Sequence, residues 1–302
     1  MGTPDFAVPC LKKLLNSEHE VAAVFTQPDK KKGRGYALTA PPIKELALKY
    51  DIEVFQPENL KTPEVLELMS NLKPDLIVVV AYGKILPSTI LNLPSLGCIN
   101  VHGSLLPKYR GAAPIQWSVI NGEKVTGVTT MYMNEGLDTG DIILQSETKL
   151  GKDETAGELF DRLSSMGADL LMETLKKFEC GCIVRKKQDD NNATYAPMLD
   201  KSFAKIDWNN SATKIHNLVR GLNPWPIAMT VVNEKILKIY KTKVKTDICG
   251  SPGEVKSIKP FIVACGDNSA IEILELQLES KKRMCSSEFF RGYRLDLGTI
   301  LG

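Results

Sequence analysis

The sequence has few of the residues that bind metals or cross-link small domains. It contains three histidines and seven cysteines in 302 residues, and no Cys-x-x-Cys pair. Cys180 and Cys182, separated by one glycine, are too close for an ordinary structural disulfide or a zinc knuckle. An odd number of scattered cysteines is typical of a reducing compartment. We therefore expect a protein of the reducing cytoplasm with no metal site.

Segments that would anchor or export the chain are also lacking. No apolar run is long enough to span a membrane, and the N-terminus has no basic segment followed by an apolar one. Phe6 occupies the position at which N-myristoylation requires Ser or Thr. The absence of Gly-x-Gly-x-x-Gly argues against an enzyme that uses a nicotinamide dinucleotide. We expect no membrane partner.

The composition is that of a globular protein large enough for two domains. Hydrophobic residues make up 43% of the sequence and charged residues 25%. Residues 1–200 hold 22 Lys and Arg against 26 Asp and Glu, whereas residues 201–302 hold 16 against 10. A basic C-terminal part favours a domain that binds polyanions, joined to a separate catalytic domain. Chance variation of the surface is the alternative.

In the N-terminal part, helical and strand-like patterns alternate. Helices are expected at 7–15, at 42–50 and from Pro63 to about Lys73, with Thr62 as the N-cap of the third. Strands are expected at 20–26, 53–55 and 76–81, and a loop at 27–39. This alternation predicts an α/β fold with right-handed crossovers and a parallel, Rossmann-like sheet.

One element of such a sheet is missing. An apolar strand should precede the first helix, but residues 1–6 form only a turn before it. Without that central strand, the neighbouring strands and helices would be exposed, at a cost of several kcal/mol against a total stability of roughly 5–15 kcal/mol. We therefore expect that the start of the sequence is placed too late.

Beyond the sheet, the pattern predicts a long helix, a linker and a small barrel. Strands are expected at 127–133 and 142–146, and Thr155 with Glu158 forms a capping box that opens an amphipathic helix. A polar stretch begins at Arg185, and short strands separated by turns follow from about Phe203. We predict a catalytic domain at 1–184, a linker at 185–202 and an OB-like β-barrel at 203–302.

The segment Ile99–Pro114 holds the candidate catalytic residues. Asn100 and His102 lie two residues apart, on one face of an extended segment, and a loop shaped by glycines and prolines follows. An amide donor beside an imidazole can stabilise an oxyanion and move a proton. Asp138 is the candidate third member, with Asp141 as a rival carboxylate. A core histidine bonded to its neighbours and an Asx-turn at Asp138 are the structural alternatives.

These residues belong to a longer string that resembles a known family. Asn-Val-His-Gly-Ser-Leu-Leu-Pro-x-Tyr-Arg-Gly-Ala-Ala-Pro, followed by Gly-Leu-Asp-Thr-Gly-Asp, is similar to the folate-dependent formyltransferases. The C-terminal string with Lys-Lys-Arg-Met and Gly-Thr-Ile-Leu-Gly extends the resemblance to nearly the whole chain, except that family members carry a first strand ahead of the equivalent of Met1. The resemblance implies that Asn100, His102 and Asp138 are catalytic.

The resemblance also implies the substrates. It places 10-formyltetrahydrofolate, as co-substrate, against Ser104, Leu105, Leu106 and Pro107, and it implies a cytoplasm of bacterial type or an organellar matrix. Tyr82 and Gly83 are further candidates for the folate site, because they follow a buried strand at the carboxyl edge of the sheet, where open α/β sheets bind ligands. The similarity is greatest to family members that formylate initiator methionyl-tRNA in translation initiation, and it implies tRNA contacts by Lys30, Lys31, Lys32, Arg34, Lys281, Lys282 and Arg283. We expect a monomer.

Alternatives remain for the basic segments and for the activity. A run of cations such as Lys30–Lys32 is, by default, a solvated surface loop. Two other functions stay open: a folate-site enzyme acting on a small amine or hydrolysing the formyl group, and a non-catalytic tRNA-binding protein on the same scaffold.

Overall fold

The computed structural model describes residues 1–32 and 37–302 and divides into two compact units. Unit 1 comprises Met1–Pro114, Val125–Lys149 and Phe160–Pro197. Unit 2 comprises Ile115–Lys124, Leu150–Leu159 and Met198–Gly302. Both units are therefore built from segments that are separate in sequence. Of the stretch predicted as a linker, residues 185–197 pack with unit 1.

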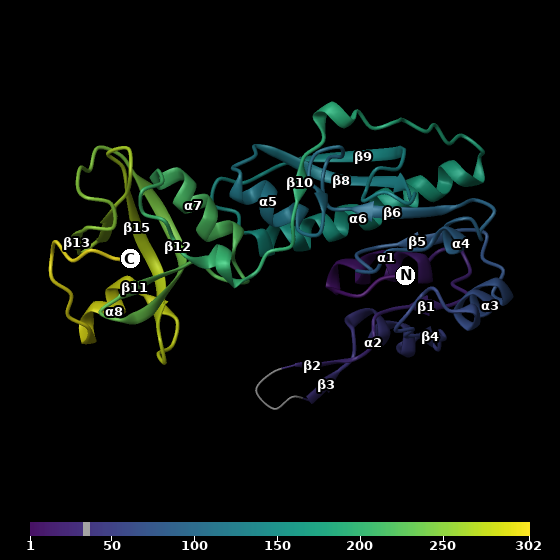
Figure 1. Ribbon diagram of the computed structural model, residues 1–302, viewed down its shortest axis with the longest axis horizontal. Coiled ribbons are helices and arrows are strands. Elements are labelled where there is room, and N and C mark those ends of the chain that lie inside the picture. The colour runs from purple at the N-terminus through teal and green to yellow at the C-terminus, as the bar shows by residue number, and fades with distance from the viewer. Residues whose placement is uncertain (33–36) are drawn as a thin grey trace. The chain divides into compact units, whose positions relative to one another are not determined.

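Unit 1 contains a mixed α/β fold (Figure 1). Its described strands are β1 (Val24–Phe25), β2 (Lys30–Lys32), β3 (Ala37–Thr39), β4 (Val54–Phe55), β5 (Ile77–Val79), β6 (Cys98–His102), β7 (Arg110–Gly111), β8 (Val125–Tyr132), β9 (Ile142–Lys149) and β10 (Tyr195–Ala196). Its described helices are α1 (Val8–Leu15), α2 (Pro42–Lys49), α3 (Pro63–Asn71), α4 (Ser88–Leu91) and most of α6 (Ala156–Glu179).

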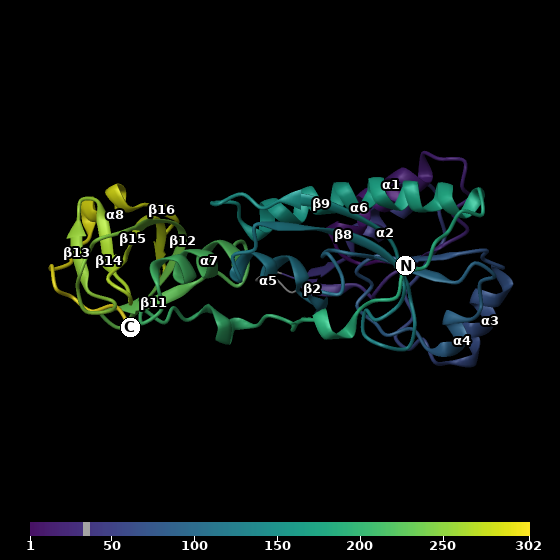
Figure 2. The same cartoon turned by 90° about the horizontal axis from the view of Figure 1, so that it is seen from above.

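Unit 1 contains a parallel pair, β1 and β4, and a separate four-stranded sheet, β5-β6-β8-β9, which is parallel on one side and antiparallel on the other. β5 pairs with β6 in parallel, with Val79 opposite Asn100, and β1 pairs with β4 in parallel. β8 runs antiparallel to both β6 and β9, so the prediction of a parallel sheet is wrong for this side. The connection between β8 and β9 is too short for a helical crossover, which requires a dozen residues or more. Figure 2 shows α1 and α6 on one side of this sheet and α3 and α4 on the other.

Three local predictions need correction. β1 and β5 are shorter than the predicted strands 20–26 and 76–81. Residues 27–39, predicted as a loop, include the antiparallel hairpin of β2 and β3, in which Lys31 lies opposite Leu38. Thr62 occupies the N-cap position of α3, as predicted, but its side chain makes no cap hydrogen bond. Strand pairing and cap geometry depend on neighbours that a local pattern does not contain.

The capping box of α6 is confirmed. The Glu158 N–H donates to Thr155 Oγ1 at 3.2 Å, and the Thr155 N–H donates to the Glu158 carboxylate at 2.8 Å. The apolar face predicted for this helix is also confirmed, since Leu159, Leu163 and Leu171 are fully buried. This reciprocal capping satisfies two donors that the first turn leaves without partners.

Unit 2 contains a curled antiparallel sheet whose edges are joined by the C-terminus. Its described elements are α5 (Pro114–Ile120, of which Pro114 belongs to unit 1), α7 (Ala212–Gly221), α8 (Ser286–Gly292), β11 (Met229–Val232), β12 (Lys235–Lys245), β13 (Val255–Ile258), β14 (Phe261–Ala264), β15 (Ala270–Leu278) and β16 (Met284–Cys285). The strand order is β11-β12-β15-β14-β13, with β16 on β15. The Val255 N–H donates to Thr299 O, and the Gly302 N–H donates to Val231 O. The last residues thus bond both outer strands, which makes the unit barrel-like.

Candidate active site

Strand β6 carries two of the candidate catalytic residues on one face. It lies between β5 and β8, so its backbone is held from both sides. His102 is 5% exposed and Asn100 is half-buried. Among the described residues, the Asn100 carboxamide has no recorded hydrogen-bond partner. Its two N–H donors are therefore available to a bound molecule.

The imidazole of His102 is hydrogen-bonded at one nitrogen and lies near a carboxylate at the other. Its Nε2 lies 2.9 Å from the carbonyl oxygen of Tyr109, and its Nδ1 lies 3.7 Å from Oδ2 of Asp138. Because a carbonyl only accepts hydrogen bonds, Nε2 must carry a hydrogen. Nδ1 is then the nitrogen that can gain or lose a proton, and it faces a carboxylate.

Asp138 is oriented by the loop that follows β6. Its Oδ2 accepts a hydrogen bond of 2.8 Å from the Gly111 N–H. Its backbone has φ +53°, in the left-handed region that Asp tolerates better than most residues. The Asx-turn in this connection is formed instead by Asn134, whose Oδ1 accepts from the Gly136 N–H at 3.1 Å. The Asp138 carboxylate therefore does not form the Asx-turn that was the structural alternative.

Two further residues that the sequence did not reveal hold this arrangement in place. Gln188 Nε2 donates to the carbonyls of Asp138 and Gly140, each at 2.8 Å. Arg110, which is 3% exposed, donates to Gln188 Oε1 from Nε at 3.1 Å and from Nη2 at 2.9 Å, and pairs with Asp190 at 2.7 Å. Gln188 lies within the predicted linker, where a polar run gave no sign of this contact.

The segment predicted to contact folate is anchored by Thr129 on β8. Thr129 Oγ1 donates to Ser104 O at 2.7 Å and accepts from the Leu106 N–H at 3.2 Å and from Gln145 Nε2 at 3.0 Å. Ser104 Oγ donates to Lys108 O at 2.7 Å. The half-buried Leu105 and Pro107 flank the buried Leu106. The segment is thus a rigid turn with apolar side chains beside β6.

Tyr82 and Gly83 follow β5 at the same edge of the sheet. Tyr82 is 1% exposed and packs in the cluster that includes Leu86 and Ile90, and burial raises the pKa of its hydroxyl to about 12. Its hydroxyl has no hydrogen-bond partner among the described residues. The Tyr82 side chain is therefore part of the hydrophobic core. The backbone carbonyls of Tyr82 and Gly83 are the polar groups at this turn, and both accept from Gln27 Nε2, at 3.0 and 3.2 Å.

The β2–β3 hairpin, which carries Lys30, Lys31 and Lys32 and is called the basic hairpin below, is held by side-chain hydrogen bonds at its base. Lys44 Nζ donates to both carboxylate oxygens of Asp29 at 2.9 Å and to Gln56 Oε1 at 2.6 Å, and Gln56 Nε2 donates to Asp29 Oδ1 at 2.7 Å. Lys30 Nζ donates to Gln27 Oε1 at 2.7 Å. Lys31 is exposed, Lys32 ends β2, and the predicted contact residue Arg34 lies outside the described residues.

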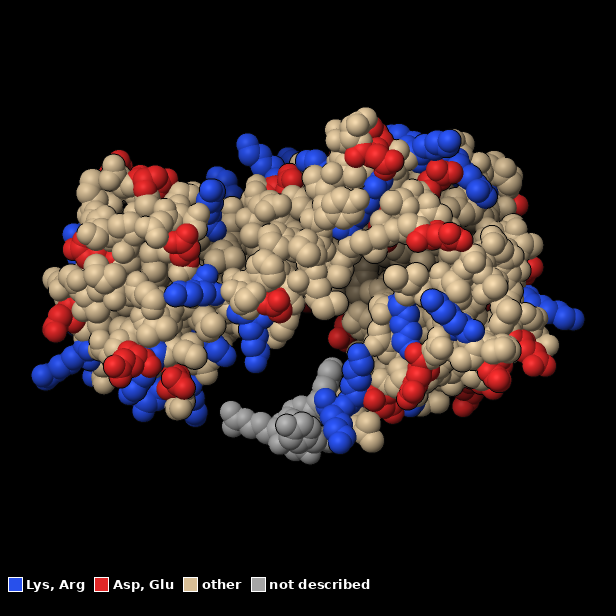
Figure 3. All heavy atoms as spheres, viewed as in Figure 1, with Lys and Arg blue, Asp and Glu red and all other residues tan. Residues whose placement is uncertain are grey.

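The basic residues of unit 2 differ in their surroundings. Lys281 and Lys282 are exposed. The Arg283 guanidinium instead bonds the Glu275 carboxylate, with Nε 2.8 Å from Oε2, and lies 4.4 Å above the Tyr240 ring. Figure 3 shows Lys and Arg on the surfaces of both units, interspersed with Asp and Glu.

Residues 1–32 and 37–302 contain no cluster of three or more His, Cys, Asp or Glu side chains that could hold a metal ion. In the same residues, no helix has both the length and the apolarity needed to cross a membrane.

Comparisons with known proteins agree on one family. The family model described as formyl transferase matches residues 1–175, and the model of the formyl transferase C-terminal domain matches residues 198–294. A methionyl-tRNA formyltransferase of Acetivibrio thermocellus is 50% identical over 306 residues, covering 100% of this chain and 98% of the relative. One of Ruminiclostridium cellulolyticum is 51% identical over 308 residues, with the same coverage.

A solved structure shares the fold at low identity. The N-formyltransferase of Helicobacter canadensis, in complex with folinic acid and dTDP-3-aminofucose, superimposes with a TM-score of 0.67 and 21% identity, covering 90% of this chain and 96% of the other.

Proposed function

Since the chain belongs to the formyltransferase family, we propose that it transfers a formyl group from 10-formyltetrahydrofolate to the α-amino group of initiator methionyl-tRNA, in translation initiation. The full-length relatives with about half of their residues identical support this substrate. Within the molecule, the proposal rests on the grouping of Asn100, His102 and Asp138. The Asn100 amide, which has no hydrogen-bond partner among the described residues, lies on the same strand face as an imidazole that faces a carboxylate.

The reaction requires an oxyanion to be stabilised and one proton to be moved. The amine attacks the formyl carbon, the new C–N bond forms, and the bond from that carbon to the folate nitrogen breaks. One proton passes from the amine to the departing nitrogen. An unperturbed α-amino group has a pKa of about 7.7–8.0, so a useful fraction is already neutral near pH 7.5. Only modest base assistance is needed.

Each candidate side chain has a role that its position allows. The Asn100 carboxamide donates to the oxyanion without any change of protonation. His102 accepts or returns the proton at Nδ1, because Nε2 is occupied by the Tyr109 carbonyl. Asp138, held by the Gly111 N–H, orients the ring and stabilises its charged form.

The rigid turn beside β6 has the chemistry of a pterin site. Leu105, Leu106 and Pro107 offer apolar surface, and the turn is backed by Thr129 and Gln145. When bound there, 10-formyltetrahydrofolate supplies the formyl carbon and the leaving nitrogen. Tyr82 and Gly83 would border the ligand from the neighbouring strand end, because ligands usually bind at the carboxyl edge of an α/β sheet.

The tRNA would be held by the basic hairpin and by unit 2. Lys30, Lys31, Lys32 and Arg34 would contact phosphates close to the catalytic unit, and Lys281, Lys282 and Arg283 would do so on unit 2, with Arg283 the least available because it pairs with Glu275. We further propose that unit 2 is an OB-like barrel, that residues 1–184 and 203–302 are the catalytic and tRNA-binding parts, and that the protein acts as a monomer in the cytoplasm.

The test is formyl transfer from 10-formyltetrahydrofolate to charged initiator methionyl-tRNA. Formylation of the tRNA, with little activity on amino sugars or purine precursors, is the expected result. Folate binding without transfer to any amine would favour the hydrolase or a non-catalytic protein. Transfer only to a small amine would replace the tRNA by another substrate.

A further inference from the structure

Two cysteines follow the last residue of α6 in unit 1. Cys180 and Cys182 are separated only by Gly181, and all three residues are exposed. Three other cysteines lie in the cores, where burial raises the pKa of each thiol to about 12: Cys10, Cys98 and Cys265. Buried thiols of this kind are inert. The exposed pair, in contrast, is open to reagents in solution.

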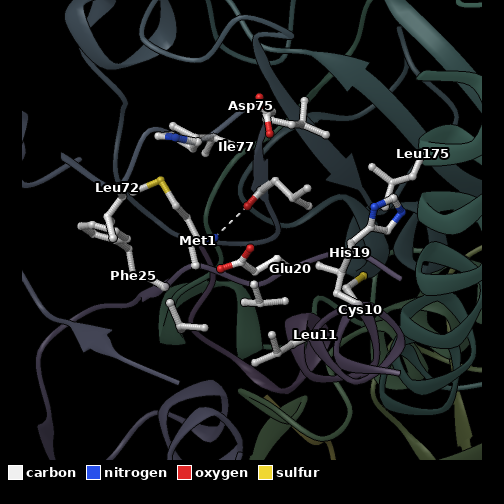
Figure 4. Close-up of a pocket in the computed structure, with 18 of the residues that line it drawn as sticks. Met1, Cys10, Leu11, His19, Glu20, Phe25, Leu72, Asp75, Ile77 and Leu175 are labelled. Carbon is white, nitrogen blue, oxygen red and sulfur yellow. Dashed lines mark hydrogen bonds between the residues drawn. The ribbon is translucent and has the colours of Figure 1, made fainter. Parts of the chain in front are cut away.

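The end of α6 is anchored up to the residue before the pair. Figure 4 shows Leu175 of α6 and His19 on the same side of a cavity in unit 1. His19 Nε2 lies 3.6 Å from the carboxylate of Glu179, the last residue of α6. The Phe178 ring packs edge-on against Tyr132, with ring centroids 6.0 Å apart. The pair therefore starts from a fixed helix end, which gives it a defined geometry.

A Schellman turn brings the two cysteines close together. The Gly181 N–H donates to Phe178 O at 3.1 Å, and the Cys182 N–H donates to Lys177 O at 2.9 Å. Gly181 has φ +64°, in the left-handed region that glycine adopts without a steric penalty. In helical geometry, Cα atoms two residues apart are separated by about 5.5 Å. Because a disulfide joins Cα atoms about 4.4–6.8 Å apart, the turn places Cys180 and Cys182 within bridging distance.

The two thiols differ in their surroundings. Cys182 Sγ lies 3.2 Å from the carbonyl oxygen of Cys180, so the second thiol is folded back onto the first cysteine. Hydrogen bonding to the Cys182 side chain lowers the pKa of Cys180, and the charge of Lys177 acts in the same direction. The hydrogen bond to Cys180 raises the pKa of Cys182. Since the thiolate is the nucleophile, Cys180 is the attacking sulfur of the pair and Cys182 the resolving one.

We propose that Cys180 and Cys182 form a dithiol site that exchanges with low-molecular-weight disulfides such as oxidised glutathione. The Cys180 thiolate attacks one sulfur of the disulfide, a mixed disulfide forms, and one small thiolate leaves. Cys182 then loses its proton and attacks the Cys180 sulfur, and the second small thiolate leaves. The protein gives up two electrons and two protons, and the small disulfide takes them up to become two thiols. An exposed disulfide that closes so short a loop belongs to the labile kind, not to the structural kind.

The segment after the pair is held by its own contacts. The Arg185 guanidinium lies 3.7 Å above the Tyr132 ring. Lys186 and Ile142 exchange two main-chain hydrogen bonds, of 2.8 and 2.9 Å. These contacts lie between the pair and Gln188, which supports Asp138. Exchange at the pair should therefore leave the candidate active site in place.

The test treats the reduced full-length chain with oxidised glutathione near neutral pH and maps every cysteine by alkylation and mass spectrometry over time. Cys249, a single exposed cysteine, is the matched control. The expected product is an internal disulfide between Cys180 and Cys182, with Cys180 reacting about tenfold faster than Cys249. In Cys182→Ser, glutathione should remain attached to Cys180, because no resolving thiol displaces it.

Three results would overturn the proposal. The first is a parent chain in which both cysteines keep glutathione and no internal disulfide forms. The second is a reaction at Cys180 that is no faster than at Cys249. The third is a disulfide between two copies of the chain, seen as a dimer that a reducing agent dissociates. None of these readouts depends on formyl transfer.

Discussion

The side-chain amide of Gln188 donates to the main-chain carbonyl of Asp138, 2.8 Å away, while Asp138 turns its carboxylate toward His102. The same Gln188 accepts from Arg110, which lies next to the Gly111 N–H that binds Asp138 Oδ2. A residue 50 positions away in sequence thus fixes the main chain that presents the carboxylate proposed to be catalytic. This relationship gives the first prediction.

Replacing Gln188 by Ala should lower kcat for formyl transfer by about 10–100-fold, since small displacements of a catalytic group are costly. KM for folate should change little, because Gln188 does not touch the predicted folate turn. Steady-state kinetics on the two substrates would measure this. Asn192→Ala, a change in the same segment that does not contact Asp138, is the matched control. An unchanged kcat in Gln188→Ala would refute this role.

Removing the donor at Asn100 should cost about 10²–10³ in kcat, the range for one oxyanion donor. Asn100→Asp tests the donor specifically, because it keeps the shape of the side chain and loses both N–H groups. Both Asn100→Ala and Asn100→Asp should bind folate normally. Asn71→Ala, at an exposed position at the end of α3, serves as control. If Asn100→Asp keeps the parent kcat, the amide does not stabilise the oxyanion.

The hairpin should bind tRNA through charge. Lys31→Ala should raise KM for tRNA and reduce the slope of log affinity against log salt by about 1, the value for one lost phosphate contact. KM for 10-formyltetrahydrofolate should stay the same. Lys49→Ala, an exposed lysine at the end of α2, should show neither effect. A salt slope identical to that of the parent would mean that Lys31 does not meet a phosphate.

The contacts of Lys44 should stabilise the fold in a pH-dependent way. Hydrogen bonds from Gln56 and Lys44 lower the pKa of Asp29 below its ordinary value. A carboxyl with a depressed pKa contributes stability above its unfolded pKa of about 3.9, and that contribution is lost as pH falls through the folded value. Lys44→Met should therefore lower the free energy of unfolding at pH 7, and the difference from the parent should shrink toward pH 3. Urea denaturation at both pH values, with Lys49→Met as control, would measure it; an equal difference at both would contradict the argument.

The capping box at α6 should contribute measurable stability. Thr155→Ala removes the Oγ1 that accepts from the Glu158 N–H and should cost about 1 kcal/mol. Hydrogen bonds from Thr155 also lower the pKa of Glu158, so part of this contribution should disappear as pH falls below about 4.3. Thr62→Ala is the matched control, because Thr62 precedes α3 without a cap hydrogen bond. Equal losses in the two variants would rule out the capping contribution.

Local sequence determined what depends on near neighbours. The capping box and apolar stripe of α6, the spacing that puts Asn100 and His102 on one face of β6, and the short strands of unit 2 all follow from periodicity and from residues three or four positions apart. The local sequence predicts these features because backbone geometry repeats over such distances.

Tertiary structure decided what depends on distant partners. The Gly111 N–H, and not a turn of its own, binds the Asp138 carboxylate; Gln188 supports the site from a polar run; and Arg283 is engaged by Glu275. The parallel pairing of β1 with β4 and of β5 with β6 likewise depends on which strand lies alongside. The sequence does not distinguish a solvated polar side chain from a hydrogen-bonded one, because only the fold brings the partner within reach.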